Sequence, residues 1–227
     1  MKLQKTFALS LLAVAALAGM PRMASAQFPL LDDFSTGKYQ KTLTWGLDQN
    51  VQTGTMVGGQ RYTSFCVSKP CSGQTNPFAQ TGSFQIAAPS GLIYSTGYKV
   101  LPQLILGYGY SAPLNLPPLK PAYNRLRLSF DGNTGITNFL IYAWSGNTNV
   151  STLSCHIPFN PNPFTVDLPF VDFKLDGGTG VDFNNLSAME LSFTEEFTTG
   201  GDDWAITRFE AIPTTNLSKP YFTCNNQ

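Results

Sequence analysis

Hydrophobic and polar residues alternate with period two in several parts of the chain. The two clearest runs have their apolar residues at Leu126, Leu128 and Phe130 and at Met189, Leu191 and Phe193. Successive side chains of a β-strand point to opposite faces, so these runs predict strands with one face in a core and the other in water. The stretch 136–144 is apolar on both faces over its second half, which predicts a central strand, or one whose outer face is covered or binds a ligand.

Turn-forming residues separate these runs at short intervals. Asp131-Gly132-Asn133, Gly58-Gly59 and Ser145-Gly146-Asn147 each stand between two apolar stretches, at spacings typical of hairpins. We expect about ten to thirteen short strands and no helix after residue 26. The pattern therefore predicts an all-β fold, an antiparallel β-sandwich.

Similar acidic and aromatic residues occur near both ends of the chain. Leu30-Leu31-Asp32-Asp33-Phe34 stands near the start, and the segment 202–212 begins with Asp202-Asp203-Trp204. We interpret these segments as the first and last strands of one closed sandwich, meeting side by side. Residues 27–227 contain no linker and no internal repeat, and their length suits a single domain.

Residues 1–26 have the features of a secretory signal peptide. Lys2 and Lys5 precede an apolar run, and Ala24-Ser25-Ala26 provides a small-residue cleavage site. No later stretch reaches the roughly 20 apolar residues that a membrane-spanning helix needs. We therefore expect a secreted or periplasmic protein without a membrane span.

The charge balance argues against a nucleic-acid-binding protein. Removal of residues 1–26 takes three basic residues with it, which leaves 11 basic against 14 acidic residues and a net charge of about −3. Charged residues make up 12% of the whole chain, and an all-β protein rich in turns suits such a composition.

An exported chain with four cysteines is expected to form disulfides. The cysteines are Cys66, Cys71, Cys155 and Cys224. Three pairings are possible, and the sequence does not choose among them. Proximity favours Cys66 with Cys71, in which case Cys155 with Cys224 would tether the C-terminal tail, residues 213–227.

The sequence offers no set of residues that indicates catalysis. His156 is the sole histidine and stands beside Cys155, which disfavours a hydrolase triad and a His/Cys zinc site. A glycosidase pair of carboxylates remains an alternative, because acidic residues are frequent in the C-terminal half. They are Asp172, Asp176, Asp182, Glu190, Glu195 and Glu196.

Aromatic residues make up 13% of the chain, and several stand on the polar phase of a strand or in turns. Amphipathic rings beside polar side chains suit a sugar-binding face, because a pyranose ring stacks on an aromatic ring while its hydroxyls form hydrogen bonds. The candidate ligand-binding residues are Arg61, Tyr62, Tyr108, Arg127, Tyr142 and Trp144. The same set of aromatic residues includes Tyr94, Tyr98 and Tyr110. For each ring of the set, the alternative to sugar binding is a structural position in the core.

Taken in order, these segments resemble the galactose-binding-like jelly-roll sandwiches, which include many non-catalytic carbohydrate-binding modules. The matching segments are 31–34, 170–173, 182–193 and 203–210. In that family a structural calcium commonly lies where the first and last strands meet, which implies Asp33 and Asp203 as metal ligands here. The same series is similar to exported bacterial PEP-CTERM proteins, but the residues after Ala211 lack the sorting tail, so we do not expect that anchor.

The leading hypothesis is an exported, non-catalytic module that binds a carbohydrate or a cell-envelope polysaccharide. The alternatives are a structural or adhesive envelope protein, and a jelly-roll hydrolase or lyase that uses carboxylates or a tyrosine with Arg127. Ligand identity and oligomeric state are not readable from the sequence.

Overall fold

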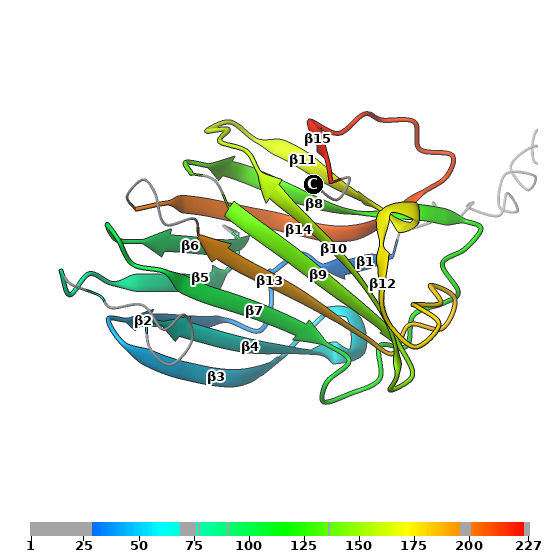
Figure 1. The fold of residues 1–227 in the computed structure, drawn as a ribbon, viewed down its shortest axis with the longest axis horizontal. Helices are drawn as coiled ribbons and strands as arrows, with labels where there is room; N and C mark the ends of the chain where they lie inside the picture. The colour runs from blue at the N-terminus through cyan, green and yellow to red at the C-terminus, as the bar shows by residue number, and fades with distance from the viewer. Residues whose placement is uncertain are drawn as a thin grey trace, which may run out of the picture.

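A computed structural model of the chain describes residues 29–68, 76, 78–89, 91–135, 137–195 and 201–224. The predicted signal peptide, Cys71 and Glu196 lie outside these residues. Within the described part, the chain forms two β-sheets and two short 3-10 turns, at Val57–Gly59 and Phe170–Asp172. The two sheets stack as layers, as Figure 1 shows. The predicted all-β sandwich is confirmed.

The larger, eight-stranded sheet has the order β15-β11-β8-β14-β6-β5-β2, with β1 added beside β14. Its strands are β1 (Leu30–Asp32), β2 (Tyr39–Leu43), β5 (Gly82–Ala87), β6 (Gly91–Thr96), β8 (Tyr123–Asn133), β11 (Phe164–Pro169), β14 (Asp203–Pro213) and β15 (Phe222–Thr223). β1 pairs antiparallel with β14, which confirms that the first and last acidic-aromatic segments meet. All pairings in this sheet are antiparallel except the short one between β11 and β15.

The seven-stranded sheet has the order β12-β10-β9-β13-β7-β4-β3 and is antiparallel throughout. Its strands are β3 (Gly46–Thr53), β4 (Gln60–Val67), β7 (Pro102–Tyr108), β9 (Thr137–Ser145), β10 (Asn149–Ile157), β12 (Lys174–Gly177) and β13 (Ala188–Glu195). β9 lies between β10 and β13, so the strand that is apolar on both faces is central, as predicted.

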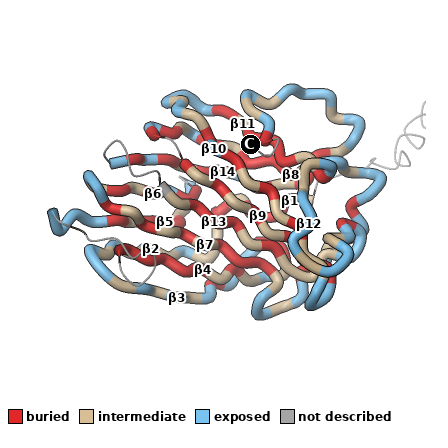
Figure 2. The backbone as a smooth tube through the Cα atoms, viewed as in Figure 1, coloured by how far each residue is buried: buried red, intermediate tan, exposed pale blue. Residues whose placement is uncertain are grey.

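The core lies between the two sheets and takes one phase of each alternating strand. The predicted inward residues of β8 and β13 are all buried. Contacts between rings join the layers, with Phe193 of β13 packing 4.7 Å from Trp204 of β14 and Tyr108 of β7 lying 6.1 Å from Phe209. Buried and partly exposed residues alternate along the strands in Figure 2. The other phase of each strand therefore forms the two outer faces of the sandwich.

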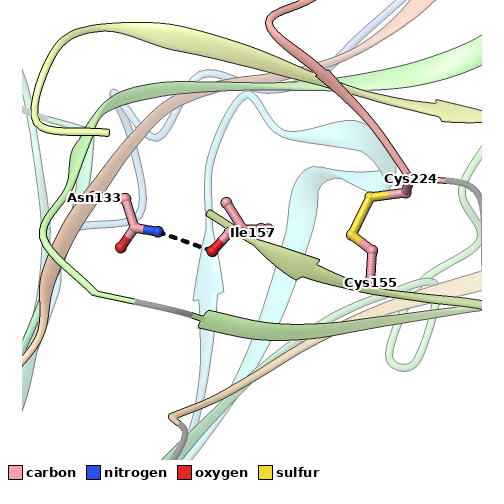
Figure 3. Close-up of a disulfide and its surroundings, with 4 residues drawn as sticks. All are labelled: Asn133, Cys155, Ile157 and Cys224. Carbon is pink, nitrogen blue, oxygen red and sulfur yellow. Dashed lines mark hydrogen bonds between the residues drawn. A yellow bond between two sulfur atoms is a disulfide. The ribbon is translucent and has the colours of Figure 1, made fainter. Parts of the chain in front are cut away.

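One predicted turn is misplaced. Asp131-Gly132-Asn133 belongs to β8, and the chain bends after it, at residues 134 and 135. The strand continues because Asn133 lies opposite Trp204 of β14. Asn133 also exchanges backbone hydrogen bonds of 2.7 and 2.9 Å with Asn160, and its side chain donates to the carbonyl of Ile157. Figure 3 shows the bond from the Asn133 side chain to the Ile157 carbonyl.

The C-terminal tail lies along the eight-stranded sheet and is joined to the other sheet by a disulfide. Cys224 follows β15, and Cys155 is an inward residue of β10 in the seven-stranded sheet. The Cys155–Cys224 bond therefore links the two layers near one edge (Figure 3). Cys66 is disulfide-bonded as well. No helix in the described part of the chain is long and apolar enough to cross a bilayer.

Loss of the Cys155–Cys224 bond is expected to destabilise the protein. The two cysteines are 69 residues apart, and closing a loop of that size removes conformational entropy from the unfolded chain worth about 4 kcal/mol. The double variant Cys155→Ser/Cys224→Ser should show this loss in denaturant unfolding. A decrease below about 1 kcal/mol would show that the bond contributes little beyond the packing of the tail.

Candidate functional site

The outer face of the seven-stranded sheet carries one row of side chains that runs across the strands. Tyr142 on β9 lies opposite Glu190 on β13, and Glu190 lies opposite Gly107 on β7. Gly107 lies opposite Tyr62 on β4, and Tyr62 opposite Val51 on the edge strand β3. Residues opposite each other in neighbouring strands point to the same face. The register therefore brings these five positions into one line on the solvent side.

Gly107 leaves a gap in this row, and the ring of Tyr110 fills it. Tyr110 follows the end of β7 and folds back over the sheet, so that a Cβ atom on Gly107 would lie only 2.8 Å from the ring. The Tyr110 hydroxyl donates a hydrogen bond to Glu190. Burial, and then the bond to Glu190 and its charge, raise the pKa of Tyr110. The hydroxyl therefore stays protonated and keeps Glu190 in place.

Four aromatic rings form a continuous group on this face, which we call the aromatic strip: Tyr62, Tyr110, Trp144 and Tyr142. The Tyr110 ring centroid lies 5.6 Å from that of Tyr62 and 6.2 Å from that of Trp144. Trp144 stacks on Tyr142 at 5.5 Å. Tyr110 is 44% exposed, and the other three rings are partly exposed. From β4 to β9 the strip spans three strand spacings, about 14 Å, which is room for a short oligosaccharide.

The strip is acidic. Glu190 lies within it, and burial followed by the charges of Asp176 and Glu190 raises the pKa of Tyr142. The outward residues of β3, β4, β7, β9, β10 and β13 in the described part of the chain include no Lys or Arg. Lys174 lies on β12, at the edge of the sheet. This face is therefore unsuited to a polyanion.

A groove of about 550 Å³ lies beside the strip, between the loop that follows β7 and the loop that precedes β13. Residues 109–116 form one side of it and residues 184–187 the other. Tyr110 belongs to both the strip and the groove. The backbone N–H of Ser187 donates to the carbonyl of Trp144 at 2.8 Å, so the wall of the groove is bonded to the end of the strand that carries Trp144.

Three of the six candidate ligand-binding residues lie in the strip: Tyr62, Tyr142 and Trp144. Arg61 and Tyr108 do not reach any surface, because each is fully buried. Arg61 pairs with Asp32 at 2.5 Å, and the Tyr108 hydroxyl donates to the same Asp32 oxygen at 2.9 Å. Burial raises the pKa of Asp32, and the charge of Arg61 opposes this shift. Arg61 and Tyr108 are therefore structural residues of the interior.

Arg127 is on the wrong sheet for this site. It lies on β8 of the eight-stranded sheet, where its Nε is 2.5 Å from the Asp167 carboxylate. Its guanidinium also donates to the Ser218 hydroxyl at 2.9 Å and to the Ser218 carbonyl at 3.2 Å. The tail thus covers Arg127, whose guanidinium is occupied by Asp167 and Ser218.

The structure does not bring Asp33 and Asp203 together. Asp33 follows β1, whose Asp32 lies opposite Phe209, whereas Asp203 begins β14 opposite Ser95. At about 3.3 Å per residue, the six residue steps of β14 from Asp203 to Phe209 span roughly 20 Å. One calcium ion cannot bind both. No group of three or more His, Cys, Asp or Glu side chains in the described residues could hold a metal ion.

The alternative catalytic residues are spread over the molecule. His156 is exposed on β10. Asp172, Asp176 and Asp182 lie on the segment that connects β11 to β13, and Glu190 is the one carboxylate inside the strip. Glu196 lies outside the described residues, and of Glu195 only the backbone is described.

The central residue of the site, Tyr110, was not among the six candidates. The phase of β7 contained the necessary signal, because Tyr108 shares its phase with the apolar Leu104 and Leu106 and so belongs in the core. The glycine at 107 then marks an outward position without a side chain of its own. Sequence reasoning that followed this phase would have removed Tyr108 from the candidates, but Tyr110 has the same phase and reaches the outer face only because the chain folds back after β7 ends.

No family model and no curated protein matches the sequence. Solved structures with a similar arrangement include a family 11 carbohydrate-binding module from Clostridium thermocellum in complex with a β-1,3-1,4-mixed-linked tetrasaccharide. That match has 12% identity, covers 81% of this chain and 94% of the module, and has a TM-score of 0.39. TmCBM61 in complex with β-1,4-galactotriose matches with 13% identity, 74% and 88% coverage and a TM-score of 0.31.

An exo-β-agarase matches over 83% of this chain and 25% of the enzyme, with 11% identity and a TM-score of 0.39. At this level of similarity, no residue of the chain is matched to a binding or catalytic residue of those proteins.

Removal of the Arg61 charge is expected to destabilise the fold. Arg61→Met keeps the volume but leaves the Asp32 carboxylate buried without its partner, which should cost about 3–5 kcal/mol. Denaturant unfolding measures this loss, and Arg208→Ala, in an exposed pair with Glu210, is the matched control. Equal stabilities of the two variants would contradict the structural role of Arg61.

Proposed function

We propose that this chain is an exported, non-catalytic protein that binds a carbohydrate on the aromatic strip. The observation that carries the proposal is the continuous group of four partly exposed rings around Glu190. On the other strands, most large rings are buried in the core. Packing of the core therefore does not explain why these four rings face solvent. Its rings offer stacking surfaces for pyranose rings.

Polar groups around the rings supply hydrogen bonds for sugar hydroxyls. The Glu190 carboxylate accepts one bond from Tyr110 and has further acceptor positions. Gln103 and Ser192 lie in the next rows of the same face and are bonded to each other at 3.2 Å. The absence of Lys and Arg from the outward positions of the described strands favours an uncharged glycan over a polyanion such as nucleic acid.

Export is supported by the signal-peptide features of residues 1–26 and by the disulfide between Cys155 and Cys224. Disulfides persist in oxidising compartments and are rare in the cytosol. A secreted or periplasmic protein would also meet polysaccharides of the envelope or of the surroundings, which fits the proposed ligand class.

The proposal that the protein is not a glycosidase rests on the positions of the carboxylates around the strip. A glycosidase of the usual kind needs two carboxyl groups on either side of the scissile bond. Glu190, the carboxylate beside the rings of the strip, is hydrogen-bonded to Tyr110, and the other acidic residue whose charge acts on Tyr142, Asp176, lies on the edge strand β12. We therefore expect no pair of carboxyl groups on either side of a bound glycosidic bond.

A structural or adhesive role has one observation in its favour. Trp45, Phe78 and Tyr98 are each about half exposed, on loops at the end of the sandwich away from the groove. Phe78 and Tyr98 contact each other at 5.6 Å, and Lys99 lies over both rings. Self-association in sedimentation experiments without any sugar, abolished by Phe78→Ala, would favour this adhesive role over glycan binding.

Truncation of strip residues is expected to weaken binding while the fold is retained. Trp144→Ala and Tyr62→Ala should each lower the affinity for a polysaccharide about tenfold or more, because a central ring in an interface typically contributes more than 1.4 kcal/mol. Affinity electrophoresis against a panel of neutral polysaccharides, followed by calorimetry, measures the change.

Tyr98→Ala is the control for these variants, since Tyr98 is exposed but lies outside the strip. The proposal is wrong if the wild type binds no polysaccharide of the panel, or if Tyr98→Ala weakens binding as much as the strip variants do.

The same panel tests the enzymatic alternative. We expect no release of reducing sugar from any polysaccharide that the protein binds. Release that is abolished by Glu190→Gln would establish a hydrolase instead and would give Glu190 a catalytic role.

A further inference from the structure

The groove beside the aromatic strip has the form of a binding site that is already built. Its volume of about 550 Å³ lies in the range of small-molecule pockets. The two loops that form it are fixed to each other, since the backbone N–H of Lys120 donates to the Asn184 side chain at 2.7 Å and that of Leu119 to the Phe183 carbonyl at 3.3 Å. A site with fixed walls loses little conformational entropy on binding.

The groove meets the strip at its middle and not at its end. Tyr110 is the shared residue, and its ring lies between those of Tyr62 and Trp144. The strip runs across the strands, whereas the groove lies where the loops following β7 and preceding β13 extend past the strand ends. A chain that lies along the strip would therefore pass the mouth of the groove with one of its inner residues.

The lining of the groove is polar and uncharged. Asn115, Asn184 and Asn185 contribute amides, Ser111 and Ser187 contribute hydroxyls, and Leu114 and Leu116 lie among them. Asn115 and Asn185 are exposed. Amides both donate and accept hydrogen bonds, as sugar hydroxyls do, while a charged group would require a countercharge that the lining lacks. This chemistry matches one neutral sugar residue.

We propose that the groove binds a sugar residue attached as a side branch to a glycan whose backbone lies on the aromatic strip. The inference rests on the proposed carbohydrate binding and specifies its ligand class as a branched neutral polysaccharide. Asn115 and Asn185 act as specificity-determining residues for the branch, and the strip binds the backbone.

Matched pairs of oligosaccharides test the proposal. Each pair has the same backbone with and without branches: a cello-oligosaccharide with the corresponding xyloglucan oligosaccharide, and a manno-oligosaccharide with its galactosylated form. Calorimetric titration of the wild type should show about tenfold tighter binding of the branched member of at least one pair, as one or two additional hydrogen bonds would give.

Two groove variants make the test specific. Asn115→Gly removes the amide and suits the left-handed backbone at this position, where φ is 53°. Asn185→Ala removes the second amide. Both should lower the affinity for the branched member to that for the linear one and leave linear binding unchanged, while Trp144→Ala weakens both. Asn147→Ala, an exposed asparagine outside the groove, is the control.

The outcomes separate the two proposals. Equal affinities of the wild type for both members of every bound pair, or groove variants that weaken linear and branched binding alike, overturn the branch site and leave strip binding intact. If neither member of any pair binds, recognition of a branch fails, and binding by the strip is decided by the panel of neutral polysaccharides.

Discussion

The ion pair between Arg61 and Asp32 lies in the interior between the sheets and fixes how they face each other. Asp32 comes from β1 of the eight-stranded sheet, and Arg61 and Tyr108 come from β4 and β7 of the other. Arg61 further donates to the side chain of Gln52 on β3 and to the carbonyl of Gly37. A buried charge without its partner is strongly destabilising, so the pair disfavours arrangements of these strands that separate Arg61 from Asp32.

The phase of β4 follows from this constraint. With Arg61 pointing inward, Tyr62 must point outward, and the register of β4 with β7 then places Tyr62 beside Gly107. A shift of one residue would exchange the two and expose the arginine while burying the tyrosine. The aromatic strip thus depends on an interaction on the opposite side of its own sheet.

Much of the fold could be predicted from the alternation of residues such as Leu126, Leu128 and Phe130, because burial of one strand face is a local property. The candidate site was predicted only in part. Tyr62, Tyr142 and Trp144 stand on the outward phase of their strands, whereas Arg61 and Tyr108 are polar or amphipathic residues on the inward phase, and residue type alone did not distinguish them. Residues 62, 110 and 142 come together through the strand order and register. Both depend on pairing between strands far apart in the sequence, which local sequence patterns do not predict.

Gly107 has a consequence for recognising relatives of this chain. Any side chain at this position would occupy the space of the Tyr110 ring, so the glycine and the aromatic residue three positions later form one unit, although neither is unusual alone. Proteins of the same fold that carry a bulkier residue at the position of Gly107 should not retain an aromatic ring at the position of Tyr110. The glycine and the tyrosine are therefore to be sought together when this surface is looked for in a related sequence.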